Sequence, residues 1–373
     1  MNCYLKASDS DKEEVIGLLN LVFSLEGNAV DYKKILPKVY SDEINGLGAD
    51  HFIVRENGLI RGVAALQIVD MDFGGNNLRV GIIGSVAVHP DSRGNEYGRW
   101  LVNYAMEEAR RESVHLLLFN GERQRVSFFG FENAGEEYAF HLSPANVQFA
   151  MKDIDASSIT YHFLTEERID EIRFVCELNR QKLCHVTRSE EELLRIMSNR
   201  GENCRIIYKN EERIGYCYGA FKELVLKDES AYPEVIKALF PDGGSVVIPA
   251  GFYEQRKIEF LSSVCEDYTL RHNAKVCVLN WKEVLRALLS FQTQRTVLRN
   301  GKKRFRIKDE DECLEIQVKG NRVSVKNAKP NRKTQTFLHN EAERAFFGLD
   351  GLLSDPKCNW FPLPFYIDSA DTL

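Results

Sequence analysis

The sequence predicts an α+β fold, with mixed α/β sheets arranged in several domains. Three observations support this prediction. Helical and strand patterns alternate near the N-terminus, a short motif occurs twice, and the last part of the chain alternates apolar and polar residues. One hydrophobic core rarely organises a chain of 373 residues, so a division into domains is expected from length as well.

The N-terminal segment begins with helices and continues into a sheet. Ser8 or Asp9 caps a run whose apolar residues recur at helical spacing, and a second helical stretch covers 31–41. Residues 51–69 read as a hairpin with its turn at Glu56-Asn57-Gly58. The later elements are a strand, loop and helix at 86–101, a buried strand at 113–120, and a turn with a closing strand at 127–142.

The hairpin pattern occurs a second time. Asn57 matches Asn210 and Gly62 matches Gly215, both at an offset of 153 positions, and helical segments precede each copy. The chain therefore reads as two copies of one domain. The second copy has no Arg-Gly loop before a helix, so only the first copy is expected to carry chemistry at that place.

From about Ser290 the pattern changes to hairpins. Apolar and polar residues alternate, with turns at 309–311 and at Gly320-Asn321, and a helix-like stretch follows at 339–353. The end, 358–373, is rich in proline and aromatic residues, which predicts an extended tail packed on a surface.

The composition limits the classes of partner. A net charge of -6 argues against a dedicated nucleic-acid binder and leaves a cationic small molecule as a reasonable ligand. The start of the chain does not read as a signal peptide, and no apolar run approaches the roughly 18 residues of a membrane helix. We expect a cytoplasmic protein that binds neither nucleic acid nor membrane.

The cysteines indicate no special chemistry. The nine cysteines are scattered without a Cys-x-x-Cys pair, which is typical of reduced, mostly buried thiols. Cys184 beside His185 suggests a nucleophile with its base, or a metal site. Adjacent residues on one element point in different directions, so an inert buried pair is the better interpretation. We expect no metal.

The strand, loop and helix after residue 85 have the layout of an anion site. Val86 and Val88 belong to a short strand, Gly94 and Gly98 allow close approach of the backbone, and an amphipathic helix follows. Backbone N–H groups and the dipole at a helix N-terminus bind phosphate groups. Arg93 adds a charged donor.

In this context the sequence resembles the GNAT superfamily of N-acetyltransferases. Its signature is a strand ending in V-x-V-x-P, a loop [R/Q]-x-x-G-x-[G/A] and a helix. Val86, Val88, Pro90, Arg93 and Gly98 match it, and the FFGF turn at 128–131 is similar to the one that follows the next strand in these families. The resemblance covers about the first 140 residues and implies acetyl-CoA as co-substrate. It implies cofactor contacts at Val86, Ala87, Val88, Arg93, Gly94, Asn95, Glu96, Tyr97, Gly98 and Arg99.

The wider layout is similar to the Eis-type acetyltransferases. These join a catalytic GNAT domain, a GNAT-like copy without cofactor and a sterol-carrier-protein-like domain. By this resemblance the domains are 1–147, 148–287 and 288–373. The resemblance also implies a homo-oligomer, which is typically a hexamer in Eis-type proteins.

The resemblance implies direct attack of a primary amine on the thioester in a ternary complex. The amine belongs to a small molecule or a lysine side chain, and with a pKa of about 10.4 it needs a base. In Eis-type enzymes the base is the terminal carboxylate, here that of Leu373, and a tyrosine in Y-x-x-F-G-[FY] protonates the thiolate. That tyrosine position is Val126 in this chain; Ser127 beside it and Tyr138 on the following strand are the candidates to replace it.

Three other residues near the loop have an ambiguous role. Glu96 occupies the first glycine position, where a requirement for positive φ costs about 1–3 kcal/mol. Glu122 either lines the acyl pocket and binds a cationic substrate or is an ordinary surface carboxylate. His89 either reaches the reacting amine or is a turn residue before a proline.

Two functions of different classes therefore remain open. The first is an acetyl-CoA-dependent N-acetyltransferase. The second is a catalytically weakened or silent GNAT-fold protein that binds CoA or regulates another protein, which Val126 and Glu96 favour. A lipid or hydrophobic ligand in the C-terminal domain is a third possibility that rests on analogy of fold alone.

Overall fold

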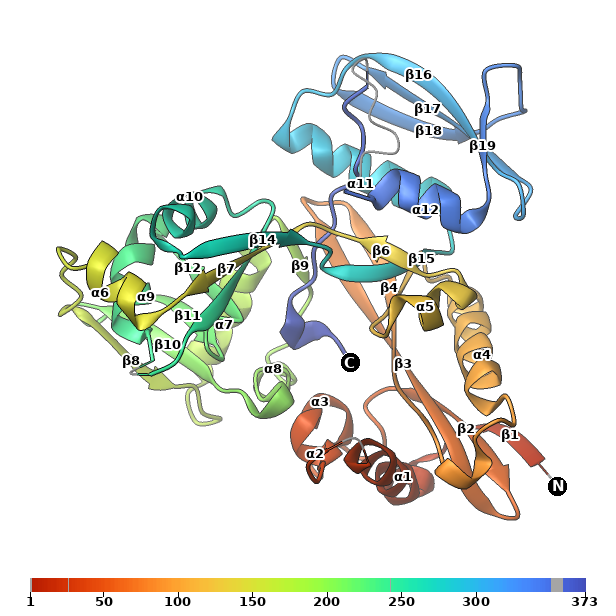
Figure 1. The fold of residues 1–373 in the computed structure, drawn as a ribbon, viewed down its shortest axis with the longest axis horizontal. Helices are drawn as coiled ribbons and strands as arrows, with labels where there is room; N and C mark the ends of the chain where they lie inside the picture. The colour runs from red at the N-terminus through yellow and green to blue at the C-terminus, as the bar shows by residue number, and fades with distance from the viewer. Residues whose placement is uncertain (1, 26, 242, 350–357) are drawn as a thin grey trace.

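The computed structural model describes residues 2–25, 27–241, 243–349 and 358–373. Sheets and helices alternate through the whole length, which confirms the α+β prediction. Figure 1 shows the first part of the chain on the right, the middle part on the left and the C-terminal domain above them.

The first domain is built on an eight-stranded sheet in the order β1-β2-β3-β4-β5-β15-β6, with β9 pairing to the far end of β3. Its strands are β1 (Asn2–Lys6), β2 (Asp50–Glu56), β3 (Leu59–Phe73), β4 (Asn77–Val88), β5 (Leu116–Phe119) and β6 (Glu132–Ala134), joined by β9 (Cys184–Val186) and β15 (Ala274–Val278). Strands β4 and β5 pair in parallel, whereas β3 and β4 pair antiparallel.

Helices cover both faces of this sheet. The helices are α1 (Lys12–Ser24), α2 (Tyr32–Ile35), α3 (Pro37–Tyr40), α4 (Tyr97–Arg111) and α5 (Arg123–Val126). Successive residues of β2 point to opposite faces of the sheet. Ile53 packs with α1, α2 and α3 on one face, and Phe52 packs with α4 on the other. Leu101 and Ala105 of α4 are fully buried, as the helical pattern predicts, and each large apolar side chain so buried contributes roughly 1.5–3 kcal/mol.

The two halves of the chain exchange strands. Strand β15, from the second half, lies between β5 and β6, and β7 (Glu137–Leu142) lies between β13 (Val246–Gly251) and β14 (Asp267–Arg271). The expectation of one closing strand at 127–142 was wrong, because Gly135 with φ 80 separates β6 from β7 and the two strands enter different sheets. An alternating pattern fixes which face of a strand is buried but does not fix its partner.

The remaining elements of the second half surround two smaller sheets, β12-β11-β10-β8 and β13-β7-β14. Its strands are β8 (Ile159–Phe163), β10 (Cys204–Lys209), β11 (Glu212–Tyr218) and β12 (Glu223–Leu226), and its helices are α6 (Pro144–Ala150), α7 (Ile169–Gln181), α8 (Leu193–Ile196), α9 (Tyr232–Leu239) and α10 (Gln255–Val264). Asn57 and Asn210 both have positive φ, and bulges follow Val54 and Ile207, again 153 positions apart.

The C-terminal domain packs two helices on a sheet in the order β18-β17-β16-β19. Its elements are α11 (Trp281–Arg295), β16 (Gly301–Ile307), β17 (Glu312–Lys319), β18 (Arg322–Asn327), β19 (Gln335–Phe337) and α12 (His339–Phe347). The positive φ angles of Asp311 and Asn321 lie in the two predicted turns. The last four residues of the helix-like stretch, 350–353, lie outside the described residues.

The tail, 358–373, enters the interior rather than packing on a surface. Trp360, Phe365 and Ala370 are almost completely buried. In Figure 1 the C-terminus ends in the middle of the molecule, between α3, α8 and β3. Within the described residues, no helix combines the length and apolarity that a membrane crossing requires.

Candidate active site

A cavity of about 490 Å³ opens where β4 and β5 separate. Their pairing ends at Ile83 and Phe119, but β4 continues to Val88. Ser85 has φ 49 beside a bulge in the β3–β4 pairing, and such a bulge bends a strand away from its neighbour. The cavity is lined by backbone-rich segments at Gly84–Val86 and Asn120–Gly121, by Gly98, Arg99 and Val102 of α4, and by side chains of Tyr32, Val126 and Leu373, among others.

The N-terminus of α4 faces this cavity. The helix begins at Tyr97, and the side chain of the preceding Glu96 makes no capping hydrogen bond to it. The first N–H groups of a helix have no partner inside the helix, so they can bind an anion. In the second half, the Asp228 carboxylate accepts a hydrogen bond from the Ser230 N–H at 2.9 Å in the turn before α9, and α9 itself also begins without a side-chain cap.

Glu96 adopts the backbone conformation that the sequence argument anticipated. Its φ is 57, in the left-handed region that favours glycine, which costs about 1–3 kcal/mol for other residues. The carboxylate lies 3.4 Å from the Arg99 guanidinium, and the Glu96 side chain is 75% exposed. It therefore points to solvent and does not obstruct the helix N-terminus.

The predicted cofactor contacts fall into three groups. Val86, Gly98 and Arg99 line the cavity. Ala87 and Tyr97 are buried in the core, and Val88 packs beside Gly98. The other members, Arg93, Gly94, Asn95 and Glu96, form the exposed loop before α4.

Gly98 has no structural reason to be glycine. It lies in the first turn of α4, and a Cβ built there would meet only Val88 Cγ2, at an ordinary contact distance of 3.7 Å. The missing side chain leaves room at the cavity wall, as close approach of a ligand to the backbone requires.

The C-terminal residue lies in the cavity. Leu373 packs against Gly84 so closely that a Cβ at Gly84 would be 2.4 Å from the Leu373 Cβ. Among the described residues, no ion pair is formed by the terminal carboxylate. The side chain of Leu373 thus lies beside β4, at the opening between the two strands.

The predicted candidates for the acid are not in the cavity. Val126 lines it and is 2% exposed, so an apolar side chain stands at the tyrosine position. The Ser127 hydroxyl is exposed and lies 3.5 Å from the Gln124 carbonyl, outside the cavity lining. Tyr138 also lies outside the cavity lining: it is on β7, which the strand exchange places in the other sheet, where its ring stacks on Phe140.

The structure places the other two ambiguous residues, Glu122 and His89, in different surroundings. Glu122 lines the cavity and forms an ion pair with Arg125 at 3.0 Å. His89 is a turn residue, because its Nδ1 accepts a hydrogen bond from the Asp91 N–H.

Sequence reasoning missed three residues of the cavity. Tyr32 lies on α2, is mostly buried, and burial raises the pKa of its phenol, so it keeps its proton. Asn120 follows β5, and Arg200 comes from the second half of the chain, where its guanidinium donates to the Thr372 hydroxyl at 3.0 Å. No local pattern distinguishes these residues, because Tyr32 reads as an ordinary core residue and Arg200 as a surface one.

A second cavity of about 580 Å³ lies against the same tail and shares Asn120 and Arg200 with the first. Lys222, Arg271 and His272 also line it. Lys222 pairs with Glu202, and Arg271 pairs with Glu137. Two cations of this lining are therefore paired with carboxylates, and among the described residues Arg200 forms no such ion pair.

Cys277, His339 and Glu343 form a further cluster outside the cavity lining, with ligand atoms within 4.8 Å of one another, so the group could hold a metal ion. Nε2 of His339 lies 3.0 Å from the Glu343 carboxylate, and Nδ1 faces Glu310. Burial alone would lower the pKa of His339, but hydrogen bonds with Cys277, Glu310 and Glu343 raise it above its usual range. An imidazolium between two carboxylates accounts for the cluster by itself.

Cys184 and His185 do not act as a pair. The Cys184 thiol donates to the Tyr366 carbonyl at 3.0 Å, and His185 Nδ1 contacts the Lys182 carbonyl. Burial raises the pKa of the Cys184 thiol, which opposes formation of a reactive thiolate.

Comparison with known proteins agrees with this geometry. Residues 4–130 match the family model described as an acetyltransferase (GNAT) domain, a segment that contains β4, the loop and α4. No curated protein matches the chain.

Three solved structures share the fold over nearly the whole chain. A protein from Enterococcus faecalis V583, described as a probable N-acyltransferase, has a TM-score of 0.68 and 13% identity, covering 93% of this chain and 89% of that one. A GCN5-related N-acetyltransferase from Kribbella flavida has a TM-score of 0.66 and 11% identity, and covers 100% of both chains. Eis1 from Mycobacterium abscessus has a TM-score of 0.64 and 12% identity, also over 100% of both chains. At identities this low the three likenesses show a shared fold, and the family match over residues 4–130 is what supports acyl transfer in general.

Proposed function

We propose that the protein is an acetyl-CoA-dependent N-acetyltransferase that acts on a primary amine of a small molecule or a lysine side chain. One observation carries this proposal: a single cavity is lined both by the first turn of α4, whose N-terminus has no side-chain cap, and by the C-terminal residue, Leu373, at the opening between β4 and β5. The first feature suits a pyrophosphate, and the second suits a base.

The cofactor would lie along β4 and end at α4. The N–H groups of the first turn of α4, with Arg99, would hold the pyrophosphate, and Gly98 would let it approach the backbone. The backbone of Gly84–Val86, which no longer pairs with β5, would hydrogen-bond the pantetheine amides. Ala87 and Tyr97 hold the loop from the core side.

In the proposed reaction the amine nitrogen attacks the thioester carbon, and the C–S bond breaks. The proton of the amine goes to the carboxylate of Leu373, and the CoA sulfur leaves as a thiolate. The phenol of Tyr32, which keeps its proton, is a group at the cavity that can donate a hydrogen bond to this leaving group. Tyr32 would thus take the role for which Val126 is unsuited.

We further propose that the acceptor enters through the second cavity. Arg200 and Lys222 favour an amine that also carries a carboxylate or phosphate group, because such a group would be attracted by their positive charge. This differs from the cationic partner that the net charge left open.

A catalytically silent CoA-binding protein is the second candidate. The buried Val126 and the left-handed Glu96 favour it, since both depart from the family pattern at the cavity.

The test is release of thiol from acetyl-CoA with a panel of amino acids, acidic peptides, lysine peptides, polyamines and aminoglycosides. CoA binding is measured in parallel by calorimetry. Turnover with any of these amines supports the transferase, and CoA binding without turnover supports the silent protein. Absence of both would reject both candidates.

A further inference from the structure

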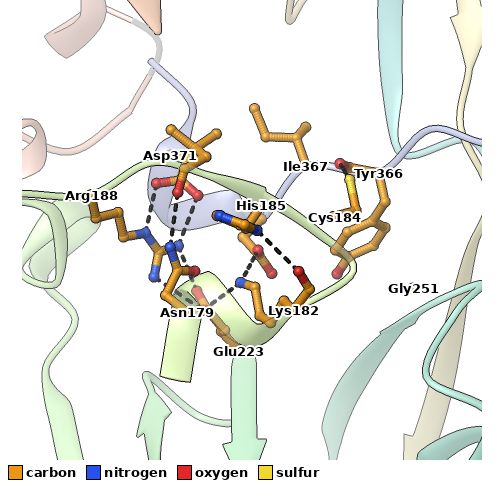
Figure 2. Close-up of polar contacts among 12 residues, drawn as sticks. Asn179, Lys182, Cys184, His185, Arg188, Glu223, Gly251, Tyr366, Ile367 and Asp371 are labelled. Atoms are coloured by element: carbon orange, nitrogen blue, oxygen red, sulfur yellow. Dashed lines mark hydrogen bonds and ion pairs between the residues drawn. The ribbon is translucent and has the colours of Figure 1, made fainter. Parts of the chain in front are cut away.

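A buried group of charges holds the C-terminal tail to the second half of the chain (Figure 2). We call this group the tail clamp: Lys182, Arg188 and Glu223 from the second half, with Asp368 and Asp371 from the tail. All five side chains are almost completely buried. The clamp ends two residues before the terminal carboxylate.

Arg188 is the centre of the clamp. Its side chain is 0% exposed and makes paired hydrogen bonds in two directions. Nε and Nη2 donate to the Asp371 carboxylate at 2.9 and 2.8 Å, and Nη1 and Nη2 donate to the Glu223 carboxylate at 3.0 and 2.8 Å. Paired bonds of this kind fix both distance and orientation.

Lys182 is the second cation of the clamp, and it binds the start of the turn at 368–371. Nζ of Lys182 lies 2.5 Å from Asp368 and 2.9 Å from Glu223. The phenol of Tyr216 also donates to Glu223, at 2.5 Å. Two carboxylates of the tail are therefore bound to one carboxylate of the second half through two shared cations.

Other contacts hold the backbone of the last residues. Nδ2 of Asn199 donates to the Ala370 carbonyl at 2.8 Å, and Nζ of Lys38 donates to the Asp371 carbonyl at 2.6 Å. Arg200 donates to the Thr372 hydroxyl. Chain ends are usually poorly ordered, whereas here successive residues up to the penultimate one are bound.

Stability alone does not explain this arrangement. Buried ion pairs are often replaceable by packed apolar residues without loss of stability, because removing charges from water is costly. The tail already buries Phe365, Ile367 and Ala370, which would hold it in place without directional bonds. A charged clamp adds a fixed position and orientation of the chain that follows it, which apolar packing specifies less strictly.

We infer that the tail clamp positions the terminal carboxylate of Leu373 in the cavity, so that the second half of the chain takes part in acetyl transfer by holding the base. This inference rests on the proposed function. It gives a role to a domain in which the sequence predicts no cofactor loop. The clamp residues are positioning residues, because they act through Leu373 and do not line the cavity.

The test compares Asp371→Asn with two other proteins. Lys209→Met is the control, because it removes an ion pair of the second half, with Glu234, that is not part of the clamp. A chain with one glycine added after Leu373 keeps the clamp but moves the carboxylate by about 3.5 Å. Each is assayed for kcat, for KM of acetyl-CoA, and for release of the C-terminal residue by a carboxypeptidase, followed by mass spectrometry.

We expect Asp371→Asn to lower kcat by about 10- to 100-fold without changing KM for acetyl-CoA. The carboxypeptidase should also release Leu373 faster from this variant than from the wild type. Lys209→Met should match the wild type in kcat and in the rate of this release. If Asp371→Asn does not fold, Thr372→Val removes the Arg200 contact without changing the buried charges, and the same effects are expected, in smaller degree.

The outcomes separate the two proposals. Unchanged kcat or unchanged release of Leu373 in the folded tail variant overturns the clamp. If the added glycine nevertheless lowers kcat, the terminal carboxylate keeps its proposed role as base. Unchanged kcat in the extended chain rejects that role, and the carboxypeptidase measurement then still decides whether the clamp holds the terminus.

Discussion

At the scale of single residues, the cavity depends on small side chains at the backbone. Gly84 makes room for Leu373, and Gly98 makes room for a ligand. The sequence allowed Gly98 to be predicted, because the spacing of the loop marks it. Gly84 could not be predicted, because its reason is a residue almost 290 positions later, which no local pattern connects to it.

Gly98→Ala should lower the affinity for acetyl-CoA without lowering the stability of the fold. Glycine in a helix interior is about 0.5–1 kcal/mol less favourable than alanine, and the added Cβ meets no close neighbour, so the unfolding temperature should rise or stay equal. The same methyl group would occupy the cavity wall, so the affinity for acetyl-CoA should fall by about tenfold, corresponding to 1.4 kcal/mol. Thermal unfolding and calorimetric titration measure the two effects. Unchanged affinity would exclude close approach of the cofactor at Gly98.

Lys38 should make stability depend on pH. Burial lowers its pKa to about 7, with Asp371 opposing this and Arg188 and Arg200 reinforcing it. Between pH 7 and 10.5 the unfolded chain binds a proton that the folded chain does not. The free energy of unfolding should therefore rise with pH in this window, by up to about 1.4 kcal/mol per pH unit.

The measurement is the unfolding temperature of the wild type minus that of Lys38→Met, from pH 7 to 10. We expect this difference to increase with pH. Lys34→Met is the control, because Lys34 lies on the same helical stretch and is 83% exposed. A constant difference for Lys38→Met would mean that the lysine keeps its proton in the folded protein.

At the scale of elements, the sequence predicted helices and turns that lie within one segment, but it did not predict which strands pair with one another. The pattern at 86–101 predicted a strand, a loop and a helix in the order that the structure shows, and the position of two turns predicted the related hairpins. The partner of β7 could not be predicted, because apolar alternation is the same for a strand in either sheet. The same limit applies to Tyr138, whose place depends on the sheet that β7 joins.

The strand exchange predicts that the first domain does not fold alone. A fragment of residues 1–147 lacks β15, so β5 and β6 lose their shared neighbour, and β7 loses both of its partners. Unpaired strand edges are prone to aggregate. We expect this fragment to be aggregated or poorly ordered, with poor dispersion in a proton–nitrogen NMR spectrum, while the full chain is folded. A well-dispersed fragment would show that β15 is dispensable for the first sheet.

At the scale of the whole molecule, three distant parts of the chain converge at the cavity. The first half contributes the N-terminus of α4, the second half contributes Arg200, and the last residues, held by the tail clamp, contribute Leu373. The loop and the terminal carboxylate could be anticipated by resemblance. The clamp could not, because Asp371 of the tail lies 183 positions after Arg188 along the chain.

The net charge of -6 does not determine the electrostatic potential at the second cavity, because Arg200, Lys222 and Arg271 line that cavity. We expect an amine that carries a carboxylate to have a higher kcat/KM than its neutral amide analogue. This preference should weaken as salt is added, because exposed charges are screened. Lys222→Glu should reverse the preference, whereas Lys227→Glu, outside the cavity lining, should leave it unchanged. Equal kcat/KM for the charged and neutral amines in the wild type would mean that the acceptor does not pass these cations, and that it reaches Leu373 from the side of α2 instead.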